Sequence, residues 1–159
     1  MRLDVVRHAH AGSRSAWDGI DAHRPLSKKG RRQAEAIADR LAADPATTIH
    51  RLVSSPSLRC VQTLEPLADR LGLAVEGDSR LLEGTRAADA LALARELAAG
   101  DGDAVVCSHG DVIPEILRAL RAAGTRVDDP FVWPKGSTWR LTGDHRHWAT
   151  ASYQPPPQL

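Results

Sequence analysis

Short apolar runs alternate along the chain with longer stretches that carry an apolar side chain every three or four residues. This alternation constrains the fold more than any other feature of the sequence. The apolar runs lie at residues 3–6, 51–54 and 104–107, with a weaker one at 73–75. Runs this short predict strands. Strands alternating with amphipathic helices predict a three-layer α/β/α sandwich around a mostly parallel central sheet.

The longer stretches predict four helices, over residues 28–43, 57–71, 87–99 and 112–123. Ser27 and Asp111 stand where N-cap residues are expected, immediately before the first and last of these helices. Pro66 interrupts the second helix, so we expect a kink there, or two abutting helices.

The C-terminal part has a different pattern. Apolar and polar residues alternate on both sides of Gly143-Asp144, which predicts a closing antiparallel hairpin. No linker or internal repeat divides the chain, so we expect a single domain over residues 1–153. Residues 154–159, rich in proline, are expected to form a flexible tail.

Composition fits one globular domain: 159 residues, 42% hydrophobic and 26% charged. The two cysteines, Cys60 and Cys107, form no CxxC pair, which argues against a disulfide scaffold or a cysteine zinc site. No apolar run is long enough to span a membrane, and the first residues lack the pattern of a signal peptide. These features predict a cytoplasmic protein without a membrane partner.

Positive charge is concentrated in the first part of the chain. Residues 1–60 contain 11 Lys/Arg and 6 Asp/Glu, a net charge of +5, whereas residues 61–159 contain 10 and 14, a net charge of −4. The basic half is suited to attract an anion. With a pI of 7.9 and no basic stripe, the chain does not have the charge of a nucleic-acid-binding surface.

Chemically versatile side chains follow three of the expected strands. Arg7 and His8 follow the first strand, Arg59 lies one helical turn after the second, and His109 follows the fourth run. Sites in parallel sheets form beyond the carboxyl ends of the strands, so these side chains are expected to converge. Guanidinium groups suit phosphate oxygens, and a neutral imidazole is a good nucleophile toward phosphorus.

Four segments in this order resemble the histidine phosphatase superfamily: VVRHAHAG (5–12), PLSKKGRRQA (25–34), SSPSLRCVQT (54–63) and VVCSHGDVI (105–113). The short length is most similar to that of the SixA-type phosphohistidine phosphatases. The segments also resemble phosphatase domains that are fused to some Nudix hydrolases.

The resemblance implies a role for each matching residue. His8 is expected to be the nucleophile that is transiently phosphorylated, while Arg7, Arg59 and His109 bind the phosphoryl oxygens. Glu83, in the segment RLLEG, matches the acid that protonates an ester leaving group in larger members of the family.

Two positions depart from the family pattern. Ala9 replaces the usual glycine after the nucleophile, and therefore needs a backbone conformation that a residue with a side chain can adopt. Arg14 replaces a frequent asparagine, and we expect it either to bind a substrate anion or to lie on the surface.

The sequence therefore predicts a phosphatase that needs no cofactor and no metal. The first substrate expected is phosphohistidine on a protein, because no insertion is present to cap a small molecule. The alternatives are a small phosphate ester or nucleotide, which Glu83 favours, and a phosphate-binding module without turnover. His8-x-His10 and His145-x-His147 have metal-ligand spacing but lack a motif such as HExxH. The oligomeric state is not predicted.

Overall fold

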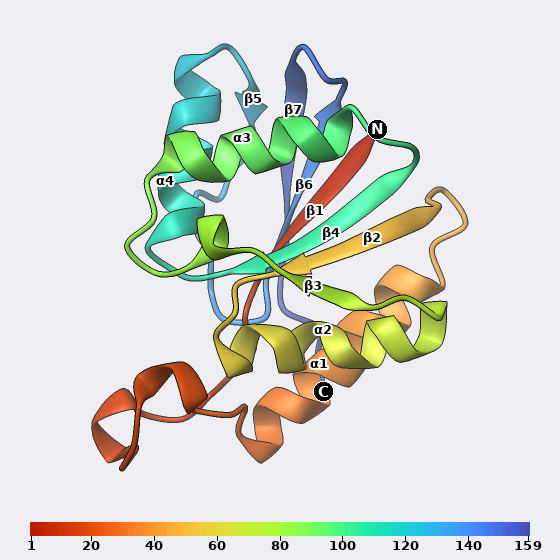
Figure 1. Ribbon diagram of the computed structural model, residues 1–159. Coiled ribbons are helices and arrows are strands. Elements are labelled where there is room, and N and C mark those ends of the chain that lie inside the picture. The colour runs from red at the N-terminus through yellow and green to blue at the C-terminus, as the bar shows by residue number, and fades with distance from the viewer.

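A computed structural model describes residues 1–159, and it contains one seven-stranded sheet flanked by four α-helices (Figure 1). The strands are β1 (Arg2–Arg7), β2 (Ile49–Ser54), β3 (Val75–Gly77), β4 (Asp103–Ser108), β5 (Arg126–Val127), β6 (Thr138–Gly143) and β7 (Trp148–Gln154). The helices are α1 (Lys28–Ala42), α2 (Leu58–Leu71), α3 (Ala87–Ala98) and α4 (Val112–Ala122), and the 3-10 turns are η1 (Arg14–Ala16), η2 (Asp21–His23) and η3 (Ser79–Leu81).

The strand order is β3-β2-β4-β1-β6-β7-β5. The first four strands in this order are parallel, and β6 and β7 form an antiparallel pair joined to β1 through β6. The predicted α/β sandwich with a mostly parallel sheet and a closing hairpin is therefore confirmed. The sequence pattern missed β5, whose two residues pair with β7 and are too short to show a period.

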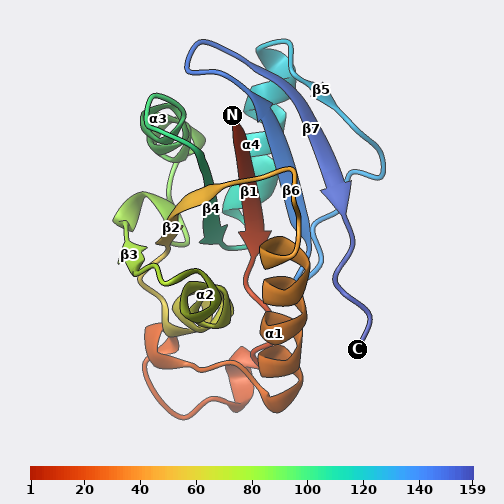
Figure 2. The same ribbon diagram turned by 90° about the vertical axis from the view of Figure 1, so that its right-hand side faces the viewer.

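Helices cover both faces of the sheet, with α1 and α2 on one side and α3 and α4 on the other (Figures 1 and 2). Successive residues of β1 serve opposite faces, as the strand period requires. Val5 packs with Leu93 and Ile113 from α3 and α4, whereas Val6 packs with Ile37 from α1.

Strand β1 also carries one buried charge. Asp4 is 1% exposed and accepts a hydrogen bond from Arg140 Nε of β6 at 2.9 Å. Arg2 Nη2 lies 3.3 Å from the same carboxylate. A buried carboxylate is tolerated here because it is paired with guanidinium groups.

Three local expectations need correction. Helix α2 continues through Pro66 as one helix, which excludes the expected alternative of two abutting helices, and Leu64, Leu67 and Ala68 around the proline are buried. Strand β3 begins at Val75, two residues later than predicted, because Gly72 ends α2 in the left-handed conformation.

The third correction concerns Asp111. It stands at the N-cap position of α4, but its side chain does not cap the helix. Its Oδ2 instead accepts a hydrogen bond from the Gly84 backbone N–H at 2.8 Å. By contrast Ser27 caps α1 as predicted, accepting from the Gly30 N–H at 3.0 Å.

The chain end continues the last strand. β7 runs to Gln154, one residue past the predicted domain boundary, and the Pro155 carbonyl accepts a hydrogen bond from Arg40 Nη1 at 2.9 Å. No helix in the structure has both the length and the apolar character that a membrane span requires.

Candidate active site

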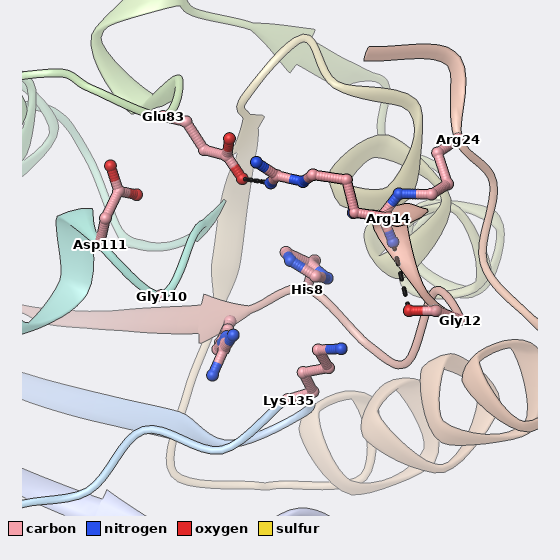
Figure 3. A pocket seen from close by; sticks show the side chains of 9 residues that line it. His8, Gly12, Arg14, Arg24, Glu83, Gly110, Asp111 and Lys135 are labelled. Atoms are coloured by element: carbon pink, nitrogen blue, oxygen red, sulfur yellow. Dashed lines mark hydrogen bonds and ion pairs between the residues drawn. The ribbon is translucent and has the colours of Figure 1, made fainter. Parts of the chain in front are cut away.

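An open pocket of about 430 Å³ lies beyond the carboxyl ends of β1 and β4, and no hydrophobic residue lines it (Figure 3). The lining residues are Arg7, His8, Gly12, Arg14, Arg24, Glu83, Gly110, Asp111 and Lys135. Four of these nine residues carry guanidinium or ammonium groups, so the pocket is suited to an anion.

His8 is buried, with 4% of its surface exposed, and its ring faces that of His109 at a centroid distance of 5.5 Å. His8 Nδ1 lies 2.8 Å from the Ala9 carbonyl oxygen. A carbonyl oxygen only accepts, so this contact assigns the proton to Nδ1 and leaves the lone pair on Nε2. Nε2 is therefore the nucleophilic atom of this imidazole.

The pKa of His8 is lowered to about 3, mainly because burial disfavours the imidazolium form. Electrostatic interactions with His109, Arg59 and Arg7 lower it further, while the contact with the Ala9 carbonyl acts in the opposite direction. The ring is therefore neutral at physiological pH, as a nucleophile must be.

Ala9 occupies the position of the family glycine without strain. It is fully buried, and no non-glycine residue of the chain has a positive φ. The Ala9 N–H donates to Thr63 Oγ1 at 3.0 Å, and the Thr63 hydroxyl donates to the Arg59 carbonyl at 2.7 Å. This chain of hydrogen bonds fixes the loop after β1 against the first turn of α2.

His109 lies at the end of β4 and is 1% exposed. Its Nε2 lies 2.8 Å from Ser55 Oγ, and its Nδ1 lies 3.4 Å from both Arg59 Nη2 and Glu83 Oε1. The contact between Ser55 Oγ and Nε2 orients the His109 ring so that Nδ1 points toward the guanidinium of Arg59.

Arg59 is also 1% exposed, and carboxylates hold its terminal nitrogens. Nη2 donates to Glu83 Oε1 at 2.8 Å and lies 3.1 Å from Asp21 Oδ2, while Nη1 donates to the Asp21 carbonyl at 3.0 Å. Its Nε is buried and has no acceptor within the chain, and the same is true of Arg7 Nε. Two buried guanidinium N–H groups of the site thus lack a hydrogen-bond partner in the chain.

Glu83 contacts three of the predicted site residues through one oxygen. Its Oε1 accepts from Arg14 Nη2 at 2.7 Å as well as from Arg59, and it lies near His109. The hydrogen bond from Gly84 N–H to Asp111 holds the loop that carries Glu83, and Figure 3 shows the ion pair between Glu83 and Arg14. The structure therefore brings together all six predicted site residues, with Arg14 on the outer wall at 60% side-chain exposure.

The pocket is also lined by four residues that were not predicted from the sequence: Gly12, Arg24, Gly110 and Lys135. Arg24 donates to the Ala11 carbonyl at 2.8 Å and to Asp21 Oδ1 at 3.0 Å, which fixes the loop between β1 and α1. Gly110 makes room for Arg7, because a Cβ there would lie 2.6 Å from the guanidinium carbon. Lys135 comes from the loop before β6.

Metal-ligand spacing in the sequence does not produce a metal cluster. No group of three or more His, Cys, Asp or Glu side chains is arranged to hold a metal ion. His10 Nδ1 lies 2.6 Å from Ser27 Oγ, at the start of α1.

The model of the histidine phosphatase superfamily (branch 1) matches residues 3–85 of this chain, which include Arg7, His8, Arg59 and Glu83. The chain belongs to this superfamily. His109 lies outside the matched range. The structure places its ring 5.5 Å from that of His8, which lies inside the range.

One curated relative is the 8-oxo-(d)GTP phosphatase of Mycolicibacterium smegmatis, 38% identical over 156 residues. The alignment covers 96% of this chain but 48% of the relative, so the chain spans about half the length of that protein.

Solved structures share the fold over almost the whole chain. The protein histidine phosphatase SixA complexed with tungstate is 22% identical, with a TM-score of 0.78, and the match covers 98% of this chain and 95% of that one. The putative phosphohistidine phosphatase SixA from Agrobacterium tumefaciens is 25% identical, with a TM-score of 0.74 and 98% of each chain covered.

Proposed function

We propose that this histidine phosphatase hydrolyses small phosphorylated molecules, phosphate esters or nucleotides, through a phosphohistidine on His8. The position of Glu83 carries this proposal. Its carboxyl group lies within hydrogen-bond distance of the groups expected to bind the phosphoryl oxygens. An alkoxide leaves badly without a proton, whereas the imidazole of a phosphohistidine leaves more easily, so an acid at this place favours an ester substrate.

The reaction takes two steps. His8 Nε2 attacks phosphorus and forms a P–N bond, while the P–O bond to the leaving group breaks and its electron pair stays on oxygen. The Glu83 carboxyl protonates that oxygen. Water then attacks the phosphohistidine as Glu83 takes the water proton, and the P–N electron pair returns to Nε2 with release of inorganic phosphate. Arg7, Arg59 and His109 stabilise the oxygens in both steps.

Binding requires an exchange of partners in the pocket. Glu83 Oε1 now accepts from Arg59, which is also expected to donate to the phosphoryl group. A bound phosphoryl oxygen replaces the carboxylate on Arg59, and the displaced Glu83 then lies beside the leaving group. Arg14 pairs with the same carboxylate oxygen and keeps Glu83 at the pocket rim during this exchange.

Removal of the phosphoryl group from protein phosphohistidine is the second candidate function. The likeness in fold to SixA and the open shape of the pocket favour it. The curated relative named as an 8-oxo-(d)GTP phosphatase instead supports the small-molecule substrate.

The test compares Glu83→Gln with the wild type on an alkyl phosphate, an aryl phosphate and a phosphohistidine protein. We expect kcat/KM to fall by roughly 10²–10⁴-fold on the alkyl phosphate and much less on the other two. Glu65→Gln, an exposed carboxylate of α2, is the matched control. Equal losses on all three substrates would assign Glu83 to binding alone. A wild type that acts only on the phosphohistidine protein would establish the second candidate.

A further inference from the structure

Lys135 is one of three lysines in the chain, and it faces the pocket without a carboxylate partner. The three arginines that line the same pocket each have an acceptor in the chain. Arg14 pairs with Glu83, and Arg24 pairs with Asp21. Arg7 Nη1 donates to the Trp133 carbonyl. In Figure 3 Lys135 lies across His8 from Glu83 and Arg14.

The backbone around Lys135 is fixed to the nucleophile strand. The Gly136 N–H lies 3.2 Å from the carbonyl oxygens of both Arg7 and His8, and the Arg7 N–H donates to the Ser137 carbonyl at 3.0 Å. Arg7 Nη1 holds the Trp133 carbonyl at 2.9 Å. Hydrogen bonds on both sides of residue 135 thus hold its backbone beside β1, and its half-buried side chain lines the pocket together with His8.

The charges around Lys135 are positive. Burial lowers the pKa of its ammonium group, and Arg7, Arg24 and Arg59 lower it further. Arg7, Arg59 and His109 are already expected to bind the phosphoryl group that His8 attacks. Lys135 is therefore an additional positive charge that this group does not require. A second anion beside the first would relieve the repulsion among these cations.

We propose that Lys135 binds a second phosphoryl group, linked directly to the one that His8 attacks, so that the preferred substrates contain a phosphoanhydride. The inference rests on the proposed function and narrows its substrate class. Trp133 and Gly136, which flank the lysine, bond to Arg7 and His8, and Lys135 lines the same pocket as these two residues. The ammonium is therefore assigned to a group adjacent to the reacting phosphorus and not to a distant part of the substrate. When His8 attacks the terminal phosphorus, the P–O bond of the anhydride breaks and its electron pair stays on the departing phosphate, whose charge Lys135 stabilises.

The test measures kcat/KM for a nucleoside diphosphate, the matching nucleoside monophosphate and p-nitrophenyl phosphate, in wild type, Lys135→Met and Lys135→Arg. We expect Lys135→Met to lose about 10- to 100-fold more on the diphosphate than on either monoester, as for one charge-assisted hydrogen bond. Lys135→Arg should recover most of this difference. Lys28→Met, on the exposed first turn of α1, is the matched control and should match the wild type.

A binding measurement separates recognition from turnover. Imidodiphosphate, whose P–N–P bridge resists hydrolysis, should inhibit the wild type more strongly than phosphate does, and Lys135→Met should remove this advantage. Equal losses on all three substrates, or none, would overturn the role of Lys135. A wild type that cleaves only monoesters would overturn the inference and leave the proposed function standing. One that cleaves only protein phosphohistidine would overturn both.

Discussion

At the scale of single residues, one hydrogen bond decides which nitrogen of His8 meets phosphorus. The Ala9 carbonyl fixes the proton on Nδ1, so Nε2 is the atom available for attack. The residue that provides this carbonyl, Ala9, is also the one that replaces the family glycine. A methyl group is accepted there because the conformation is one that any residue adopts.

Replacing His8 by alanine should abolish turnover and leave the fold intact, because it removes the atom that receives the phosphoryl group. Wild type quenched during turnover of ³²P-labelled substrate should carry a label that is acid-labile and base-stable, and mass spectrometry should place it on His8. A label on Cys60, or full activity in His8→Ala, would refute the assignment.

The low pKa of His8 also makes stability depend on pH. The unfolded ring titrates near 6.5 and the folded ring near 3, so between these values the unfolded chain binds a proton that the folded chain does not. The neutral His8 ring therefore contributes fully to the free energy of unfolding above pH 6.5. As the pH falls from 6.5 toward 3, this contribution decreases by about 1.4 kcal/mol per pH unit.

Between pH 7.5 and pH 5 the free energy of unfolding should therefore fall by about 2 kcal/mol more in the wild type than in His8→Gln. Urea denaturation of both proteins at the two pH values measures this difference. Parallel pH dependence of the two proteins would contradict the low pKa.

At the scale of elements, two glycines near the first turns of helices have different structural roles. Gly110 lies between β4 and α4, where an added Cβ would meet the mobile end of Arg7. Gly30 lies in the first turn of α1, where an added Cβ would come within 1.9 Å of the His10 backbone carbonyl. Gly110 leaves space for the Arg7 guanidinium in the site, and Gly30 allows α1 to pack against the loop after β1.

Gly110→Ala should therefore lower kcat/KM by at least about tenfold, because Arg7 is displaced from the phosphoryl oxygens, with a change in stability under about 1 kcal/mol. Gly30→Ala should instead lower the melting temperature, because backbone must move. Thermal unfolding and steady-state kinetics on both variants separate the two effects. A Gly110→Ala enzyme with wild-type kinetics would show that Arg7 does not need its observed position.

The sequence was sufficient to predict residues that follow strands directly. His8 and His109 follow apolar runs, and parallel strands bring such ends to one edge of the sheet. The two rings meet because β1 and β4 are neighbours in that sheet. Lys135 could not be found in this way. It stands in a loop without periodicity, and it reaches the pocket only because β6 pairs with β1, a contact between the two ends of the chain. Asp111 was misassigned because an N-cap position looks the same in sequence whether or not its side chain caps the helix.

At the scale of the whole molecule, the candidate site depends on strands from both halves of the chain. β1 lies between β4 and β6, and neither neighbour belongs to residues 3–85, the range matched by the family model. That range is therefore not a folding unit. It also lacks His109 and Lys135.

A fragment of residues 1–85 should show no cooperative thermal transition by circular dichroism, whereas the full chain should unfold in one. The physical reason is that β1 has no strand to pair with on either side. A cooperative transition in the fragment would mean that α1, α2 and the first strands form a core of their own.

The pairing of Asp4 with Arg140 has a consequence for the chain while it is being made. Strand β1 is synthesised well before its antiparallel partner β6. Until β6 appears, the edge of β1 that will pair with it stays open, even after β4 has paired with the other edge, and an open edge is a template for association with other chains. A charge in the second position of the run LDVV opposes that association, as gatekeeper residues do. When β6 arrives, Arg140 neutralises the same charge inside the sheet, so the residue that keeps the nascent strand apart also helps to select its final neighbour.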